Sequence, residues 1–313
     1  MTEKKHTIMA VHAHPDDEVV FTGGTLALYG KQGVQTVLVT ATGGEEGEIH
    51  DPDLDPGEAR LRLGEIRREE LQKAVDILGI DHLEMLGYRD SGMVGTEPNN
   101  RVDNFHNADH EEATSKLVML VRRYKPDVLI TYDEFGSYGH PDHIKCNVIT
   151  HAAYEKAGDP AYHPEFGEPW EPKKLYYTHW AEENFEKARA MYKERGLKWP
   201  WDEEAQKPDE DPQHQGVEEG LAEQEQEVVE AKAEGKEPKY VPPPVTSRID
   251  VREFLDVKHD SMVVHRTQFA PDGLFETMPE DIAAVAWGEE QYSLVESRVD
   301  APDQETDLLA GLD

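Results

Sequence analysis

The sequence has little of three things that would mark whole classes of protein. It contains one cysteine, Cys146, in 313 residues, which excludes an internal disulfide and favours a reducing compartment, so we expect a cytoplasmic protein. No run approaches the ~18 apolar residues of a membrane helix, and we expect neither a membrane span nor a secretory signal. Basic residues are also scarce, since 32 Lys and Arg face 66 Asp and Glu for a formal charge of −34. This charge disfavours nucleic acids and anionic membranes as partners.

The negative charge is unevenly distributed along the chain. Residues 202–239 hold 14 acidic side chains against four lysines, and shorter acidic stretches occupy 45–58 and 300–313. This composition predicts a solvated insert that the core does not need, with a docking or regulatory role as the alternative. The expected parts are a core over residues 1–200, an acidic low-complexity insert over 201–241, a C-terminal portion packing on the core over 242–300, and an acidic tail over 301–313.

Short apolar segments alternate with helical patterns through the expected core. The patterns predict strands at residues 7–13, 34–42, 82–86, 127–132 and 174–179, with helices at 23–32, 58–78, 111–124 and 142–156. This alternation predicts an α/β fold, a Rossmann-like three-layer sandwich with a mostly parallel sheet. A strand at 246–250 and helices at 251–266 and 281–287 predict a smaller C-terminal α+β portion.

Histidine and aspartate gather at two predicted strand ends. The first strand runs into HPDDE at residues 14–18, and the fourth leads through a glycine-rich loop to HPDH at 140–143. The carboxyl ends of parallel strands form the ligand site of such sheets. His14 and Asp17 lie on one turn, and His143 can join them from the other strand end. Two histidines and a carboxylate with an open fourth position are typical of catalytic Zn²⁺, and another divalent transition metal would also fit.

The neighbouring residues supply the other groups that a metal-assisted hydrolase needs. Asp16 is the candidate general base for a water whose pKa the metal lowers. An oxyanion develops during amide hydrolysis and requires a donor opposite the metal. His140, oriented or kept protonated by Asp142, can be that donor and then protonate the leaving amine. Tyr138 is a second candidate donor.

Each motif taken alone has a simpler interpretation. HPDDE and HPDH could be helix N-termini whose acids complement the helix dipole. Cys146 follows His143 by three residues, but a thiolate would close the metal site, so we interpret it as a small buried residue. His106 and His110 have the spacing of a second metal site but lie in a polar segment, which favours solvent exposure. No G-x-S-x-G or G-x-G-x-x-G motif supports a serine nucleophile or a dinucleotide site.

Several motifs together resemble the PIG-L/LmbE family of zinc-dependent N-deacetylases. They are HAHPDDE after the first strand, TGGEEGE at 42–48, GYRDSGM at 87–93 and TYDEFGSYGHPDH at 131–143. The later segments HPDHIKC, AAYEKAGDP, GEPWEPKKLYY and VVHRTQF are similar to the branch that contains mycothiol S-conjugate amidase and N-acetylglucosaminyl-inositol deacetylase. The acidic insert departs from the family pattern, so the resemblance implies nothing about the shape of the distal part of the substrate site.

The resemblance implies hydrolysis of the amide on a glucosamine-type sugar nitrogen. It implies the metal, base and acid roles given above, and it adds Arg67 and Asp90 as residues that hold sugar hydroxyls. The alternatives are a surface ion pair of Arg67 with Glu69 or Glu70, and a turn role for Asp90. The expected partner is a small N-acylated glucosamine derivative. The acyl group, acetyl or a larger thiol-bearing residue, and a homo-oligomeric state stay open. A noncatalytic sugar- or metal-binding module with the same fold is the alternative function.

Overall fold

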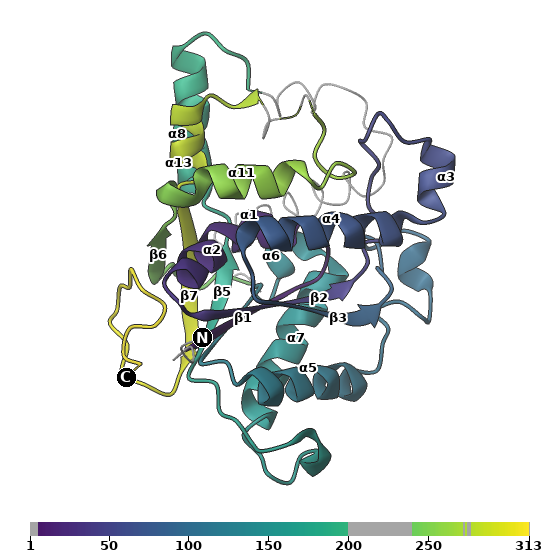
Figure 1. Ribbon diagram of the computed structural model, residues 1–313, viewed down its shortest axis with the longest axis vertical. Coiled ribbons are helices and arrows are strands. Elements are labelled where there is room, and N and C mark those ends of the chain that lie inside the picture. Colours follow the sequence, from purple (N-terminus) through teal and green to yellow (C-terminus); the bar gives the residue numbers. More distant parts are fainter. Residues whose placement is uncertain (1–5, 200–239, 272, 274–276, 313) are drawn as a thin grey trace, which may run out of the picture.

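The computed structural model describes residues 6–199, 240–271, 273 and 277–312. A seven-stranded sheet forms its centre, with the strand order β3-β2-β1-β4-β5-β7-β6 (Figure 1). Strands β1 to β5 run parallel, and β7 is antiparallel to both of its neighbours. The strands are β1 Thr7–His12, β2 Gln35–Thr42, β3 His82–Tyr88, β4 Val128–Thr131, β5 Lys174–His179, β6 Ser247–Asp250 and β7 Glu289–Ser297. The expected α/β fold with a mostly parallel sheet is confirmed.

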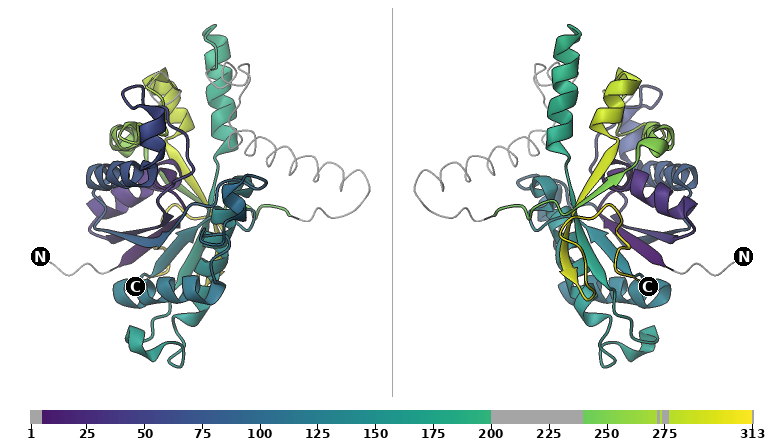
Figure 2. Two further views of the ribbon diagram at one scale, coloured as in Figure 1. Left: turned by 90° about the vertical axis from the view of Figure 1, so that its right-hand side faces the viewer. Right: turned by 90° about the vertical axis from the view of Figure 1, so that its left-hand side faces the viewer.

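Helices cover both faces of this sheet, as the two views of Figure 2 show. Successive residues of β1 point to opposite faces: Ile8 belongs to the apolar cluster beneath α2, α4 and α11, and Met9 to the cluster beneath α5 and α7. The helices are α1 Asp17–Phe21, α2 Gly23–Lys31, α3 Pro56–Arg60, α4 Leu63–Leu78, α5 His110–Tyr124, α6 Gly136–Gly139, α7 Pro141–Lys156, α8 Glu182–Glu194, α11 Leu255–Val263 and α13 Glu280–Ala286. Short 3-10 turns occupy η1 Pro98–Asn100, η2 Pro164–Phe166 and η3 Arg252–Phe254.

Two expected helices differ from the observed ones. The segment expected as one helix over 58–78 forms α3 and α4, because Asp55 caps the short α3 and the chain leaves helical geometry at Arg62, whose φ is −135°. The expected helix over 251–266 begins as η3 and continues as α11, which ends at Val263. Helix α8 and strand β7 were not expected.

The C-terminal portion completes the sheet of the core. Its strand β7 pairs with β5 on one side and β6 on the other. After β7 the chain returns to the sheet, where the buried Glu305 lies 2.6 Å from the ammonium of buried Lys174 and accepts from the Ser247 hydroxyl at 3.0 Å. Leu308 is fully buried beside them. The expected acidic insert lies almost wholly outside the described residues, and the domain boundaries stay predictions.

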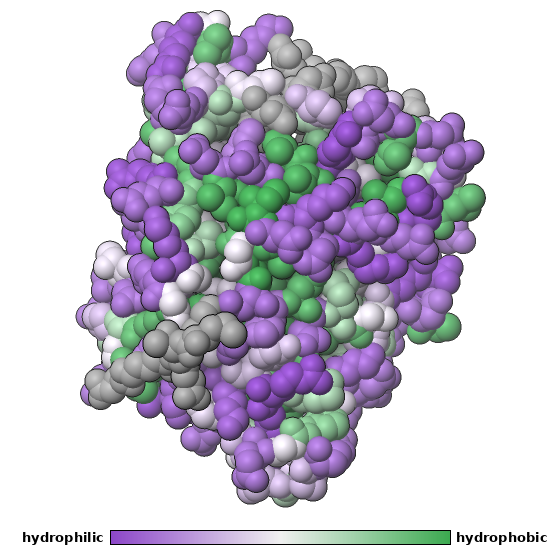
Figure 3. Space-filling model, in the orientation of Figure 1, coloured by the Kyte–Doolittle hydropathy of each residue, from purple (hydrophilic) through white to green (hydrophobic). Residues whose placement is uncertain are grey.

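The outer face shown in Figure 3 is largely hydrophilic. Apolar side chains gather around α11, where the partly buried Leu255, Val257 and Val264 pack against the core. Helix α11 therefore closes the core on the side of the sheet where α1 and α2 lie (Figure 1).

Candidate metal and active site

The predicted site residues meet where β1 and β4 end side by side. From β1 the chain proceeds outward to β2 and β3 on one side, whereas β4 and β5 extend the sheet on the other. Ligand sites of open α/β sheets lie at such a switch point, outside the carboxyl ends of the strands. The turn after β1 carries His14 and leads into α1, and the loop after β4 passes through α6 into α7. Both histidine motifs therefore reach the same place.

Three side chains converge at this edge with the spacing of metal ligands. His14 Nδ1 lies 3.2 Å from His143 Nε2 and 3.4 Å from an Asp17 carboxylate oxygen, and His143 Nε2 lies 3.4 Å from the other Asp17 oxygen. A tetrahedral zinc ion with bonds of about 2.0–2.1 Å separates its ligand atoms by roughly 3.3 Å. Ligand atoms of His140 also approach those of His14 and His143 within 4.8 Å, in a wholly buried group. These residues could hold a metal ion.

The Asp17 carboxylate is held by contacts that the sequence did not reveal. The Tyr132 hydroxyl donates to it at 2.7 Å, and the backbone N–H of His14 donates at 2.8 Å. Burial alone would raise the pKa of Asp17, but His143 and His14 outweigh burial and hold that pKa well below its usual range. The Tyr132 ring also stacks on His143 with centroids 4.0 Å apart. The sequence pattern places Tyr132 only at the end of an apolar strand.

Asp16 projects from the same turn toward Arg67. The guanidinium donates to the Asp16 carboxylate at 2.9 Å and to the carbonyls of Pro15 and Gly44 at 2.6 and 2.8 Å. Burial raises the pKa of Asp16 to about 7, although the Arg67 charge opposes this shift. A carboxyl group with a pKa near neutrality suits a general base.

Arg67 is almost completely buried, with 3% of its surface exposed. Its contacts with Pro15 and Asp16 fix the turn after β1. It does not form the surface ion pair with Glu69 or Glu70 that was the alternative: the Glu70 carboxylate accepts from Thr267 at 3.0 and 2.6 Å. Its contact with sugar hydroxyls stays a prediction.

Asp142 contacts His140 through its backbone, whereas its carboxylate has other partners. That carboxylate accepts hydrogen bonds from the backbone and hydroxyl of Ser91 and lies 3.3 Å from His14 Nε2. His140 is held instead by the backbone N–H of Asp142, which donates to its Nδ1 at 3.1 Å. Burial and the nearby His14 lower the pKa of His140 to about 3, although the Asp142 charge opposes this shift. The neutral ring then carries its proton on Nε2, where it can donate.

Asp90 is a buried neighbour of the metal-binding group. Its carboxylate accepts from the backbone N–H of Gly92 at 2.8 Å and of Glu46 at 3.2 Å, and it lies 3.5 Å from His14 Nε2. Burial alone would raise the pKa of Asp90, but His14 and His140 hold it below its usual range. With Asp142, Asp90 orients His14 so that its Nδ1 faces His143, as outer carboxylates do for metal-binding histidines. A contact from Asp90 to a sugar stays a prediction.

The remaining candidate residues lie as follows. The Tyr138 hydroxyl is 3.4 Å from His143 Nε2, so this side chain does point to the metal-binding group. Cys146 is fully buried and belongs to neither cluster of potential metal ligands in the described residues. His106 and His110 are exposed, as expected.

The fold and the site together define a class of protein. It is a Rossmann-like α/β protein with a buried histidine and aspartate group at the strand ends and a carboxyl group of near-neutral pKa beside it. The family model described as "PIG-L: GlcNAc-PI de-N-acetylase" matches residues 9–154.

Curated relatives extend this match to nearly the whole chain. The 1D-myo-inositol 2-acetamido-2-deoxy-alpha-D-glucopyranoside deacetylase 1 of Catenulispora acidiphila is 37% identical over 97% of this chain and 89% of its own length. A deacetylase with the same sugar name from Streptomyces avermitilis is 37% identical over 97% of both chains. The chain belongs to the PIG-L family, and the enzyme class expected from its motifs, an amide hydrolase, is confirmed.

Solved structures share the fold. The N,N'-diacetylchitobiose deacetylase of Pyrococcus horikoshii has a TM-score of 0.57 at 17% identity, over 94% of this chain and 87% of that chain. The 4-carboxy-2-hydroxymuconate hydratase GalB of Pseudomonas putida has a TM-score of 0.54 at 16% identity, over 95% and 99%. Since one neighbour is titled a hydratase, the fold alone does not determine the reaction.

Proposed function

We propose that this chain is a zinc-dependent N-deacetylase that hydrolyses the acetamide of an N-acetylglucosaminyl-inositol. The observation that carries the proposal is the convergence of His14, Asp17 and His143 at 3.2–3.4 Å beside the Asp16 carboxylate. The names of the curated relatives support the substrate. When bound, zinc supplies a Lewis acid that lowers the pKa of water toward ~7 and polarises a carbonyl.

The residues of the chain divide the proton transfers between them. Asp16, held by Arg67, accepts a proton from the water that attacks the amide carbon. His140 presents its Nε2–H to the amide oxygen as negative charge develops there, and Asp16 then passes the proton that it took from the water to the departing amine. The Tyr138 hydroxyl is the second donor near the amide oxygen. Acetate and the free amino sugar are the products.

Two alternatives lead to different products or to none. A larger thiol-bearing acyl group would make the enzyme a conjugate amidase, and the relatives' names favour acetyl. A noncatalytic module would not need both Asp16 and His140 in the site, and both are present.

Metal removal and one substitution test the proposal. Dialysis against a chelator should abolish release of amine from N-acetylglucosaminyl-inositol, and Zn²⁺ should restore it. Asp16→Asn should keep its zinc content and lose most turnover, whereas the control Asp109→Asn, at the N-cap of α5, should retain turnover because asparagine also caps helices. Full activity without metal, or in Asp16→Asn, would refute the proposal. An acyl-cysteinyl glucosaminyl-inositol conjugate as parallel substrate separates deacetylase from amidase.

Location and assembly are a separate question from the reaction. No helix in the described parts of the chain is long and apolar enough to cross a membrane. The cytoplasmic location and any homo-oligomer stay predictions.

A further inference from the structure

The turn that carries Asp16 is contacted by a residue from the far end of the chain. His265 Nε2 lies 2.7 Å from one Glu18 carboxylate oxygen, and the other oxygen accepts the backbone N–H of Asp16 at 2.9 Å. Glu18 and His265 are both fully buried. His265 follows α11 in the VVHRTQF segment, and the proposed reaction gives neither residue a role. A continuous path of hydrogen bonds therefore joins His265 to the proposed base.

Asp16 needs such support because its backbone conformation is unfavourable. Its φ is +125°, a region that residues with a side chain rarely adopt and that persists only where the surroundings impose it. Glu18 holds the N–H of Asp16, and Arg67 holds its carboxylate from the other side. Together these two contacts restrain the N–H and the carboxylate of Asp16, and with them the direction of its side chain.

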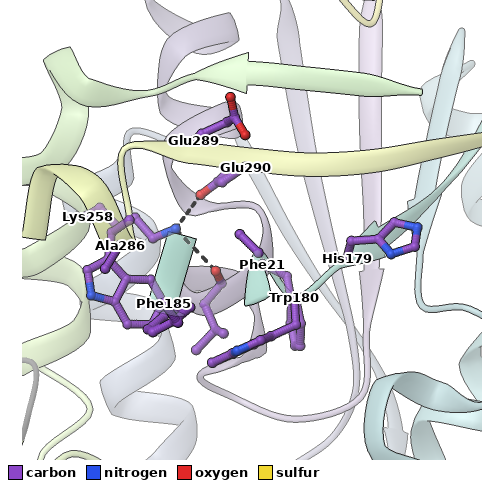
Figure 4. A pocket seen from close by; sticks show the side chains of 11 residues that line it. Phe21, His179, Trp180, Phe185, Lys258, Ala286, Glu289 and Glu290 are labelled. Atoms are coloured by element: carbon purple, nitrogen blue, oxygen red, sulfur yellow. Dashed lines mark hydrogen bonds and ion pairs between the residues drawn. The ribbon is translucent and has the colours of Figure 1, made fainter. Parts of the chain in front are cut away.

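A second buried contact holds α1, the helix that follows this turn. The Lys258 ammonium lies 2.5 Å from Glu290 and donates to the carbonyl of Val20 at 3.2 Å (Figure 4). The Glu290 carboxylate accepts from the backbone N–H groups of Gly24 and Thr25 at 2.9 and 2.8 Å. This contact holds α1 and α2 in place, whereas the Glu18 carboxylate acts directly on the backbone N–H of Asp16.

We propose that Glu18 and His265 are positioning residues for the hydrolysis: His265 fixes the Glu18 carboxylate, which holds the backbone of Asp16 so that its side chain meets the attacking water. The inference rests on the proposed function, in which Asp16 is the base. Neither residue belongs to the groups that could hold a metal among the described residues. Their loss should therefore change turnover, and should leave metal content and substrate affinity nearly unchanged.

A pair of amide substitutions at His265 tests this inference. Glutamine places its amide nitrogen near the position of Nε2 and can still donate to Glu18, whereas asparagine is one methylene too short. We expect His265→Asn to lower kcat by ~10–100-fold with KM and zinc content within twofold of wild type, and His265→Gln to recover most of the loss. The control Tyr176→Phe removes a hydroxyl that donates to another buried glutamate, Glu305, at 2.5 Å, and should keep kcat. Equal kcat values in the two amide variants, or an equal loss in the control, would overturn the inference.

A double-substitution cycle with Asp16→Asn shows whether the effect passes through the base. If His265 acts through Asp16, His265→Asn should lower kcat of wild type but not the residual kcat of Asp16→Asn. The same fold loss in both backgrounds would refute the positioning role and leave the base role intact. Wild-type turnover in Asp16→Asn would instead refute the base role, and the inference with it.

Discussion

The Tyr132 hydroxyl should set much of the metal affinity, and Tyr132→Phe removes it without changing the ring. The hydroxyl donates to Asp17 at 2.7 Å and accepts from the backbone N–H of Ala13 at 2.8 Å, in a fully buried position. Loss of an outer contact to a metal ligand weakens affinity by ~10–100-fold, which is about 1.4–2.8 kcal/mol. The buried N–H left without its partner should also lower the free energy of unfolding by about 1–3 kcal/mol.

Two measurements separate these effects. Competition with a chromophoric chelator gives the zinc Kd, and urea unfolding of the metal-free protein gives the stability. Tyr154→Phe is the matched control, since Tyr154 is equally buried but donates only to the carbonyl of Lys173 at 3.4 Å, away from the site. A zinc Kd for Tyr132→Phe within twofold of wild type, together with reduced stability, would show that the hydroxyl supports the fold and not the metal.

Three further predictions concern the turn after β1 and its neighbours. Because the base must be ionised and the pKa of Asp16 is raised to about 7, kcat/KM should fall as the pH drops through about 7; a rate that is flat from pH 8 to 5 would contradict this. Arg67→Met removes the charge that lowers this pKa, so the acidic limb of the kcat/KM profile should move to higher pH, and an unmoved limb would refute the pairing. A Cβ atom added to Gly24 would lie 2.6 Å from the Cβ of Val251, so Gly24→Ala should lower the free energy of unfolding in urea by about 1–3 kcal/mol. The control Gly30→Ala should cause no such loss, because the nearest atom to its added Cβ lies 3.6 Å away.

The convergence of His14, Asp17 and His143 was predictable because local patterns and sheet topology place all three residues. His14 and Asp17 share one turn, and His143 follows the strand that pairs directly with β1. Alternating strands and helices require those strand ends to lie at one edge of the sheet. The convergence of these three side chains could therefore be predicted from the sheet topology without knowledge of any other long-range contact.

Contacts between distant segments were not predictable in the same way. The partner of Arg67 is Asp16, 51 residues away, and that of the Asp142 carboxylate is Ser91, also 51 residues away. A charged side chain shows in sequence that it needs a partner, but not which one it finds. Local patterns therefore suggested His140 as the partner of Asp142, and the three-dimensional structure supplied another.

Strand β7 was missed for a related reason. Its sequence, EEQYSLVES, places Glu290, Gln291 and Ser293 in buried positions, where a strand normally shows apolar residues. Each of these polar side chains has hydrogen-bond partners, including Lys258 for Glu290 and His179 for Ser293. Burial of paired polar groups removes the alternation on which strand prediction depends.

The contact between Glu18 and His265 also bears on how an active enzyme is made. It joins residues 247 positions apart, and the contact of Gly24 with Glu290 spans 266. During synthesis His14, Asp17 and His143 all emerge before position 150, yet the last restraints on the turn that carries Asp16 emerge more than a hundred residues later. Such long-range closures are entropically costly and form late in folding. A chain that ends before residue 265 lacks the contact with Glu18 even though it contains His14, Asp17 and His143, so we expect it to be deficient in catalysis whatever metal it binds.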